Sequence, residues 1–138
     1  MTLVAPVPGL EPAFTVDARL GPLEDHGMTR AGRRRVVPIA GGQVVRPDGT
    51  VEIDTRYSAR TTRGEYVHFR TSGIRSGPPP VLAALLRGED VDPASYYFRV
   101  AVYLETSAPR LDFLERSVFV ASAARGADTV CYTAYRVT

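Results

Sequence analysis

The stretch YYFRVAVYLET, from Tyr96 to Thr106, decides the fold because its side chains alternate with the two-residue period of a β-strand. Its even positions are aromatic or aliphatic, and we expect them to pack in a core. Its odd positions carry two phenols, a guanidinium and a carboxylate, namely Tyr97, Arg99, Tyr103 and Glu105. This odd face is either a solvated sheet surface or the polar lining of a cavity.

The length and composition favour one domain over residues 1–138. A chain of 138 residues with 44% hydrophobic content is typical of a globular fold with one core. The formal net charge is only +2, and arginines and acidic residues are interspersed along the chain. The adjacent Arg33, Arg34 and Arg35 would point to alternating faces of a strand and form no continuous patch. We therefore expect no nucleic-acid partner.

Several kinds of chemistry are excluded by the residue types that are rare or missing. All 17 basic residues are arginine, so the chain has no Schiff-base lysine, no attachment point for pyridoxal phosphate and no P-loop lysine. One cysteine and two histidines argue against a disulfide framework and a metal centre. No cofactor is expected. The N-terminal residues have neither a basic leader nor a long apolar run, which predicts a cytoplasmic protein without membrane association.

Most of the remaining chain has the pattern of strands. A half-buried strand is predicted over 13–20, a second strand over 32–42 that ends on paired glycines suited to a turn or bulge, and a last pair over 117–123 and 129–137. A hairpin over 51–72 turns near Arg63 and Gly64. Pro47, Asp48 and Gly49 predict a tight turn before it. A short helix is expected over 81–87 with Gly88 as its cap, and another over 107–116 with Ser107 as its N-cap. This order favours an all-β fold, an antiparallel barrel or a sandwich, with one or two short helices.

Several separated motifs resemble the family called domain of unknown function 3237. They are GRRRVVPIAGG (32–42), VVRPDGTVEIDTRY (44–57), VDPASYYFR (91–99) and LERSVFVAS (114–122). The resemblance covers nearly the whole chain and implies an antiparallel β-barrel of the calycin or allene-oxide-cyclase type. The family usually carries about twenty further residues after Gly42, ending in an Asp-Trp pair. If this segment is truly absent, a gap or open mouth is expected beside Arg35.

The resemblance also bears on the candidate site, because Tyr97, Arg99 and Glu105 lie in motifs of the family pattern and could face a cavity. Asp54 belongs to the EIDTRY motif, and Glu105 or Asp54 would be the catalytic base. Tyr97 would donate a proton and Arg99 would stabilise an enolate-like oxygen. The further ligand-binding candidates are Tyr57, His68, Arg35, Arg70, Arg75 and Tyr103. Each charged residue among these candidates could equally be an ordinary surface residue. Cys131 is expected in the core.

Two functions of different kinds fit these residues. The first is a barrel that encloses an apolar or aromatic metabolite and performs cofactor-free isomerisation, cyclisation or water elimination by general acid and base chemistry. The second is a carrier or sensor barrel that binds such a ligand unchanged. A homodimer or an interaction protein, in which the polar face meets a partner, is a third possibility.

Overall fold

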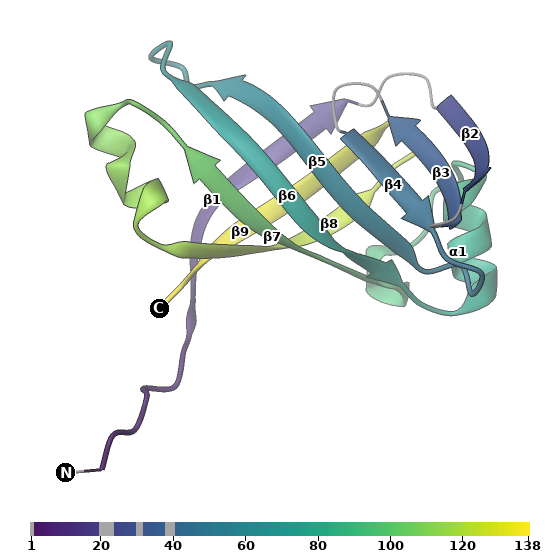
Figure 1. Cartoon of the computed structure of the whole chain (residues 1–138), viewed down its shortest axis with the longest axis horizontal. Helices are drawn as coiled ribbons and strands as arrows, with labels where there is room; N and C mark the ends of the chain where they lie inside the picture. Colours follow the sequence, from purple (N-terminus) through teal and green to yellow (C-terminus); the bar gives the residue numbers. More distant parts are fainter. Residues whose placement is uncertain (1, 20–23, 30–31, 38–40) are drawn as a thin grey trace.

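The computed structural model describes the backbone of residues 2–19, 24–29, 32–37 and 41–138, and the side chains of residues 2–18, 28 and 44–138. Within these ranges the chain forms nine strands and three short helical segments (Figure 1). The strands are β1 (Leu10–Arg19), β2 (Glu24–Thr29), β3 (Gly32–Val37), β4 (Gly41–Val45), β5 (Val51–Arg60), β6 (Tyr66–Ser76), β7 (Tyr97–Glu105), β8 (Val118–Arg125) and β9 (Thr129–Val137). The helical segments are α1 (Pro79–Leu86), η1 (Pro93–Ser95) and η2 (Pro109–Glu115).

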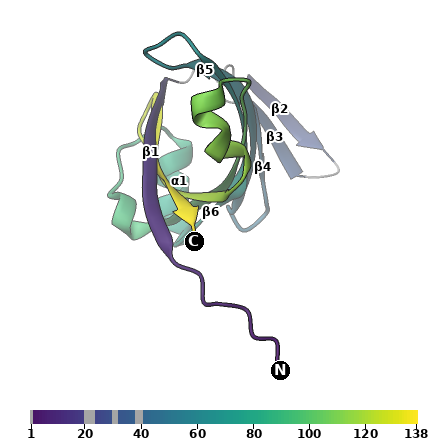
Figure 2. The ribbon, with the colours of Figure 1, turned by 90° about the vertical axis from the view of Figure 1, so that its left-hand side faces the viewer.

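The strands form one antiparallel sheet in the order β1-β9-β8-β7-β6-β5-β4-β3-β2. The sheet curls strongly, so that β1 lies across the concave side of its middle strands (Figures 1 and 2). The Phe14 ring of β1 accordingly lies 6.1 Å from the Phe69 ring of β6 and 5.8 Å from the Phe119 ring of β8. In the described residues, no ladder joins β1 to β2. The fold is therefore an antiparallel, barrel-like sheet without full closure, which confirms the predicted fold class.

The turn chemistry predicted from the sequence is present between β4 and β5. Gly49 has a φ of +88°, which favours glycine because a side chain there would be strained. The Arg46 amide donates to the Thr50 carbonyl at 2.8 Å, and the Thr50 amide donates to the Asp48 carboxylate at 2.9 Å. The two strands that follow, β5 and β6, pair over their whole length and confirm the predicted hairpin.

The first predicted helix is confirmed as α1, whereas the predicted cap of the second is wrong. Leu82 and Leu85 of α1 are buried, and Gly88, with a φ of +78°, follows the helix end. The N-cap of η2 is Ala108, with no side-chain cap. The hydroxyl of Thr106, rather than that of Ser107, accepts a hydrogen bond from the Ala108 amide at 3.2 Å.

The core lies on the concave side of the sheet, where the even-numbered residues of β7 are all buried as predicted. Phe119 and Ala134 are at most 1% exposed, so β8 and β9 supply the same core. Burial of a side chain as large as Phe119 stabilises the fold by about 1.5–3 kcal/mol. The backbones of β6 and β7 approach so closely at Gly73 that a Cβ there would lie 2.2 Å from the Arg99 carbonyl oxygen.

The structure differs from the sequence analysis in three places. Residues Glu24–Thr29 form strand β2, where no strand was predicted. Cys131 is exposed rather than buried, because the inward position at this point of β9 belongs to its neighbour Tyr132. In the described backbone, the gap expected beside Arg35 is not found, because Arg35 pairs with Asp25 of β2 and with Gln43 of β4. None of the described helices is long and apolar enough to cross a membrane.

Candidate functional site

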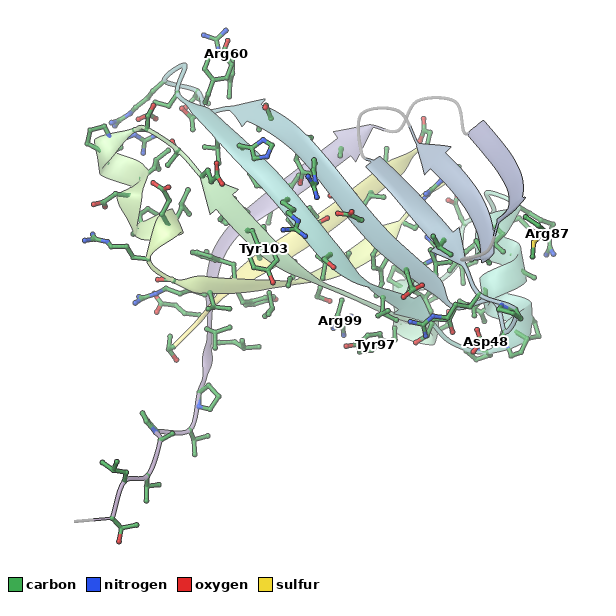
Figure 3. The ribbon with its side chains drawn as sticks, in the orientation of Figure 1. Asp48, Arg60, Arg87, Tyr97, Arg99 and Tyr103 are labelled. Carbon is green, nitrogen blue, oxygen red and sulfur yellow. The ribbon has the colours of Figure 1, made fainter. Side chains whose placement is uncertain are left out.

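The odd face of β7 lies on the convex, solvent-facing side of the sheet (Figure 3). Tyr97 and Tyr103 are 51% and 58% exposed, and Arg99 and Glu105 are exposed as well. Of the two alternatives for this face, the structure shows the solvated sheet surface, and none of the four side chains lines the interior of the curled sheet. The physical reason is that the apolar even residues occupy the concave side, and alternation along a strand then sends the polar residues outward.

These outer side chains pack against one another as surface residues do. The Arg99 guanidinium lies 5.3 Å from the centre of the Tyr97 ring, and that of Arg70 lies 5.7 Å from the Tyr103 ring. His68 stands opposite Glu105 in the β6–β7 ladder, and both are exposed. Such contacts stabilise a sheet surface by fractions of a kcal/mol up to about 1 kcal/mol each.

The other candidates divide between the two faces. Asp54 is exposed on the convex side, as are His68 and Arg70, so none of the three reaches the interior. Arg35 was a ligand-binding candidate, but its side chain lies outside the described residues. Two candidates point inward: Tyr57 is partly buried, and Arg75 is 2% exposed with its guanidinium 5.6 Å from the centre of the Phe98 ring.

Hydroxyl groups on the concave side form two hydrogen-bonded pairs. The Tyr57 hydroxyl of β5 bonds to the Tyr132 hydroxyl of β9, which crosses the interior of the curled sheet. Thr55 and Thr71, directly opposite each other on β5 and β6, share a second hydrogen bond. These four hydroxyls, together with the buried Arg75, are among the polar groups that the described residues place on an otherwise largely apolar concave face.

The tyrosine pair stays protonated over the physiological pH range. Burial raises the pKa of the Tyr132 phenol, and its hydrogen bond with Tyr57 raises it further. Burial also raises the pKa of Tyr57, although the hydrogen bond from Tyr132 opposes this effect. Two protonated phenols have two O–H groups, and their mutual hydrogen bond uses one. The second O–H group can donate to a ligand.

A pocket of about 470 Å³ opens at one end of the curled sheet. Most of its wall is apolar and includes Phe14, Val16, Val67, Phe69, Leu104 and Leu114. The Phe69 ring stacks on the Tyr57 ring with centroids 4.9 Å apart and an interplanar angle of 4°. Tyr57 thus lies directly behind the Phe69 wall of the pocket, and Tyr132 is hydrogen-bonded to Tyr57 without lining the pocket itself.

The short η2 segment covers this end of the sheet (Figure 2), where its Leu111 and Leu114 are buried and an ion pair joins it to Glu65. Arg110 of η2 donates to both carboxylate oxygens of Glu65, at 2.5 to 2.9 Å, and the Thr61 hydroxyl donates to the same carboxylate. These hydrogen bonds, the one from Arg110 first, hold the pKa of Glu65 below its usual range. We call the Glu65–Arg110 pair the latch.

Tyr132, Thr55 and Thr71 were missed as site residues. The available signal was a hydroxyl at an inward position of a strand, as in the run Val51, Ile53, Thr55, Tyr57, where polar atoms share the apolar face. Buried hydroxyls need hydrogen-bond partners, so hydroxyls at inward positions of a strand indicate polar contacts in the interior as charged residues do. Among the described residues, no cluster of three or more potential metal ligands exists.

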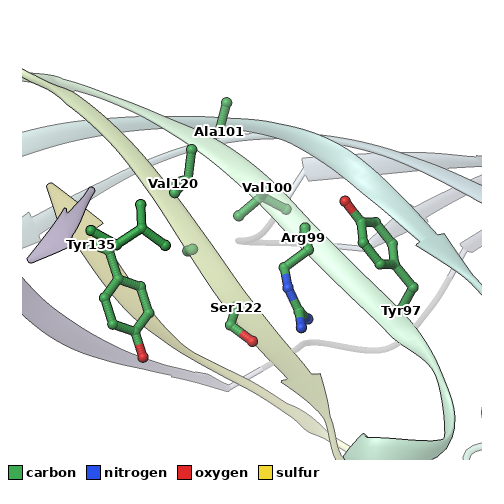
Figure 4. Close-up of a pocket in the computed structure, with 9 residues that line it drawn as sticks. Tyr97, Arg99, Val100, Ala101, Val120, Ser122 and Tyr135 are labelled. Atoms are coloured by element: carbon green, nitrogen blue, oxygen red, sulfur yellow. The ribbon is translucent and has the colours of Figure 1, made fainter. Parts of the chain in front are cut away.

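A second depression, of about 500 Å³, lies on the convex side of β7, β8 and β9 (Figure 4). Tyr97 and Arg99 stand on one side of it and Tyr135 on the other, while Val120 and Ser122 form the floor between them. Leu10, at the start of β1, also lines it. We call this depression the outer groove. Two of the predicted site residues therefore do line a pocket, but on the outside of the sheet.

The fold and its inner pocket define a small antiparallel, barrel-like protein with a largely apolar interior. The chain belongs to the family described as protein of unknown function (DUF3237), whose model matches residues 43–137. This confirms the resemblance seen in the sequence motifs.

Relatives with similar sequences and structures support the same assignment. A UPF0311 protein of Bradyrhizobium diazoefficiens is 36% identical over 90% of this chain and 93% of its own length. A conserved protein of unknown function from Rhodopseudomonas palustris has a crystal structure that matches 98% of this chain and 100% of its own, with a TM-score of 0.89 and 33% identity. A beta-barrel like protein of Acinetobacter baumannii matches 99% of this chain and 100% of its own, with a TM-score of 0.83 and 34% identity.

Proposed function

We propose that this protein binds a small apolar or aromatic molecule carrying a hydrogen-bond-accepting oxygen in the pocket between β1, β6 and η2. The observation that carries the proposal is the Tyr57 ring stacked behind the Phe69 wall of the pocket, with its hydroxyl bonded to that of Tyr132. A pocket of about 470 Å³ lies within the range of small-molecule sites, which are mostly apolar with a few polar groups that orient the ligand.

The polar groups of the site favour an uncharged oxygen such as a carbonyl or a phenol. The remaining O–H group of the tyrosine pair is a donor at neutral pH, because both phenols have raised pKa values. Unbranched apolar chains or aromatic rings would contact Phe14, Phe69 and Leu114. The Phe69 ring separates the hydroxyls of Tyr57 and Tyr132 from the pocket. The ring would have to move aside for the ligand oxygen to reach these hydroxyls.

Binding without conversion, as in a carrier or sensor, is the better-supported form of this proposal. No carboxylate is buried among the described residues, and Asp17, which lines the pocket, is exposed, so no desolvated general base faces a bound ligand. Glu105, Asp54 and Arg99 stand on the far side of the sheet from this pocket. An isomerase, cyclase or dehydratase using the same site would have to take its proton from the Tyr57–Tyr132 pair.

The test is a ligand screen on the whole protein. Aromatic ketones, phenols and medium-chain aldehydes would be screened by saturation-transfer NMR, and affinities measured by calorimetry for wild type and Tyr132→Phe. Loss of the donor is expected to weaken binding about tenfold, equal to about 1.4 kcal/mol, for ligands with an oxygen acceptor. The matched control is Tyr103→Phe, which removes an exposed hydroxyl from the convex side. Equal affinities of Tyr132→Phe and wild type would overturn the proposed site.

A further inference from the structure

The residues before β1 form an extended arm that leaves the body of the molecule (Figures 1 and 2). Its sequence from Thr2 to Gly9 is TLVAPVPG, which contains no charge. The side chains of Leu3, Val4 and Val7 are 88%, 82% and 92% exposed. Branched aliphatic side chains at this exposure, three within one short segment, are typical of a surface that is covered by a partner.

Hydrogen bonds fix the end of the arm at Gly9, and two prolines restrict its backbone direction. The Gly9 carbonyl accepts from the Thr138 amide at 2.9 Å, and the Gly9 amide donates to the Thr138 carbonyl at 3.3 Å. Pro6 and Pro8 each fix φ near −65°, and the residue before each proline is held in an extended conformation. The arm therefore cannot reverse within residues 5–8, and it points away from its own sheet.

The outer groove has the chemistry that such an arm requires. Its walls are the aromatic rings of Tyr97 and Tyr135, and its floor has the small side chains Val120 and Ser122 (Figure 4). Proline-containing extended segments bind grooves lined by aromatic rings, because their rigid conformation loses little entropy. Among the described residues, no carboxylate lines the groove, and the Arg99 guanidinium beside it can donate to carbonyl oxygens of a bound backbone.

We propose that the outer groove binds the N-terminal arm, Thr2 to Gly9, of a second copy of this chain. Eight residues in a polyproline-like conformation span about 25 Å, whereas three neighbouring strands span only about 10–15 Å. The arm is thus long enough to cross β7, β8 and β9 of the partner. In each copy, Leu10 lines that copy's own groove and directly follows its own arm, so the departing arm and the accepting groove lie next to each other.

Two-fold symmetry makes the exchange reciprocal. Each copy donates one arm and accepts one, so every contact occurs twice, as in other isologous dimers. This arrangement covers Leu3, Val4 and Val7 together with the exposed rings of the groove. It is independent of ligand binding in the inner pocket, which lies on the concave side of the sheet.

The first experiment is sedimentation velocity on the whole chain from about 1 to 100 µM. Wild type is expected to sediment as a dimer of 15.0 kDa chains at the upper end of this range. Removal of residues 2–8, and separately Tyr97→Ala, are expected to give monomers. Tyr103→Ala is the matched control, because this tyrosine is exposed on the same strand but does not line the groove. It should remain dimeric, and circular dichroism would confirm that each variant folds.

A mixing experiment then shows that the arm acts between two copies. The arm-deleted protein keeps its groove, and Tyr97→Ala keeps its arm, so an equimolar mixture retains one of the two arm contacts. It is expected to form a heterodimer that is weaker than the wild-type dimer, although each protein alone is monomeric. A synthetic TLVAPVPG peptide should also shift the NMR signals of Ser122 and Tyr135 in the arm-deleted protein. A monomeric wild type at 100 µM, a dimer that survives removal of the arm, or an arm-deleted protein whose NMR signals do not change with the peptide would each overturn the proposal.

Discussion

The hydroxyls of Tyr57 and Tyr132 share a hydrogen bond inside the curled sheet although 75 residues separate them in the chain. One lies on β5 and the other on β9, and these strands are not neighbours in the sheet. The contact therefore exists only because the sheet curls far enough to bring its concave surfaces together. It links the tertiary structure to the hydrogen-bond donor of the proposed ligand site.

Stability is expected to fall as the pH rises above about 10, where the tyrosines of the unfolded chain begin to ionise. The folded pKa values of Tyr57 and Tyr132 lie above that of the unfolded chain. The native state therefore holds these protons after the unfolded state has released them, so deprotonation favours unfolding. The slope is at most about 1.4 kcal/mol per pH unit for Tyr132, and less for Tyr57, which water screens more. Urea unfolding at pH 8 to 11 measures it.

The double variant Tyr57→Phe, Tyr132→Phe is the comparison for that titration. It removes both phenols, so its stability should depend less on pH between 9.5 and 11 than that of wild type, by up to about one proton per removed group. Tyr66→Phe, an exposed tyrosine on β6, serves as control. A double variant with the wild-type pH slope would mean that the pair does not carry the effect.

Opening of the latch is expected to expose the pocket of about 470 Å³ between β1, β6 and η2. Arg110→Gln removes the cation that the Glu65 carboxylate binds through both of its oxygens, so η2 should exchange its amide hydrogens faster and bound ligands should dissociate faster. Because the folded pKa of Glu65 is lowered, this contact is complete above the ordinary pKa of 4.5 and is lost as the pH falls through the folded value. Hydrogen exchange at pH 7 tests the variant.

The control for the latch is Arg116→Gln, which removes an exposed arginine that pairs with Asp112 just after the same segment. Its exchange rates in η2 should stay close to those of wild type. Equal protection of η2 in Arg110→Gln and wild type would show that apolar packing alone holds the segment.

Glu105→Gln is expected to leave ligand binding and stability nearly unchanged. The carboxylate is exposed on the convex side, and surface substitutions of this kind usually change stability by less than about 0.5 kcal/mol. Calorimetry with a ligand from the screen and a thermal melt measure both quantities. A strong loss of binding would return Glu105 to the candidate site.

Gly73→Ala is expected to destabilise the fold by about 3 kcal/mol, because the new Cβ would lie 2.2 Å from the Arg99 carbonyl oxygen and 2.7 Å from the Val100 Cα. Both atoms belong to backbone and cannot move aside without separating β6 from β7. Ser72→Ala, at the adjacent exposed position, is the matched control and should unfold at nearly the wild-type urea concentration.

Much of the fold follows from local patterns. Alternation over β5 to β9, the turn at Gly49 and the cap at Gly88 depend on a few neighbouring residues, and the structure confirms each of them. Strand β2 was missed because EDHGMT, from Glu24 to Thr29, contains a glycine and lacks an apolar alternation.

The site was harder to predict, because alternation separates the two faces of a strand but does not say which polar groups meet. The charged face of β7 drew attention through Arg99 and Glu105, yet charged side chains are hydrated at low cost on the convex surface. The hydroxyl of Tyr132 gave no comparable signal. Its contact with Tyr57 depends on how strongly the sheet curls, and no short stretch of sequence determines this curvature.

The outward position of Cys131 makes the natural sequence ready for spectroscopic labelling. Its thiol is exposed, and it is the only cysteine in the chain, so a nitroxide or fluorophore would attach at one defined point without prior mutagenesis. The label would stand on the outside of β9, one residue from the phenol of Tyr132 on the inside. Probes at this position could follow both the spacing between two copies and the response of the strand to a ligand.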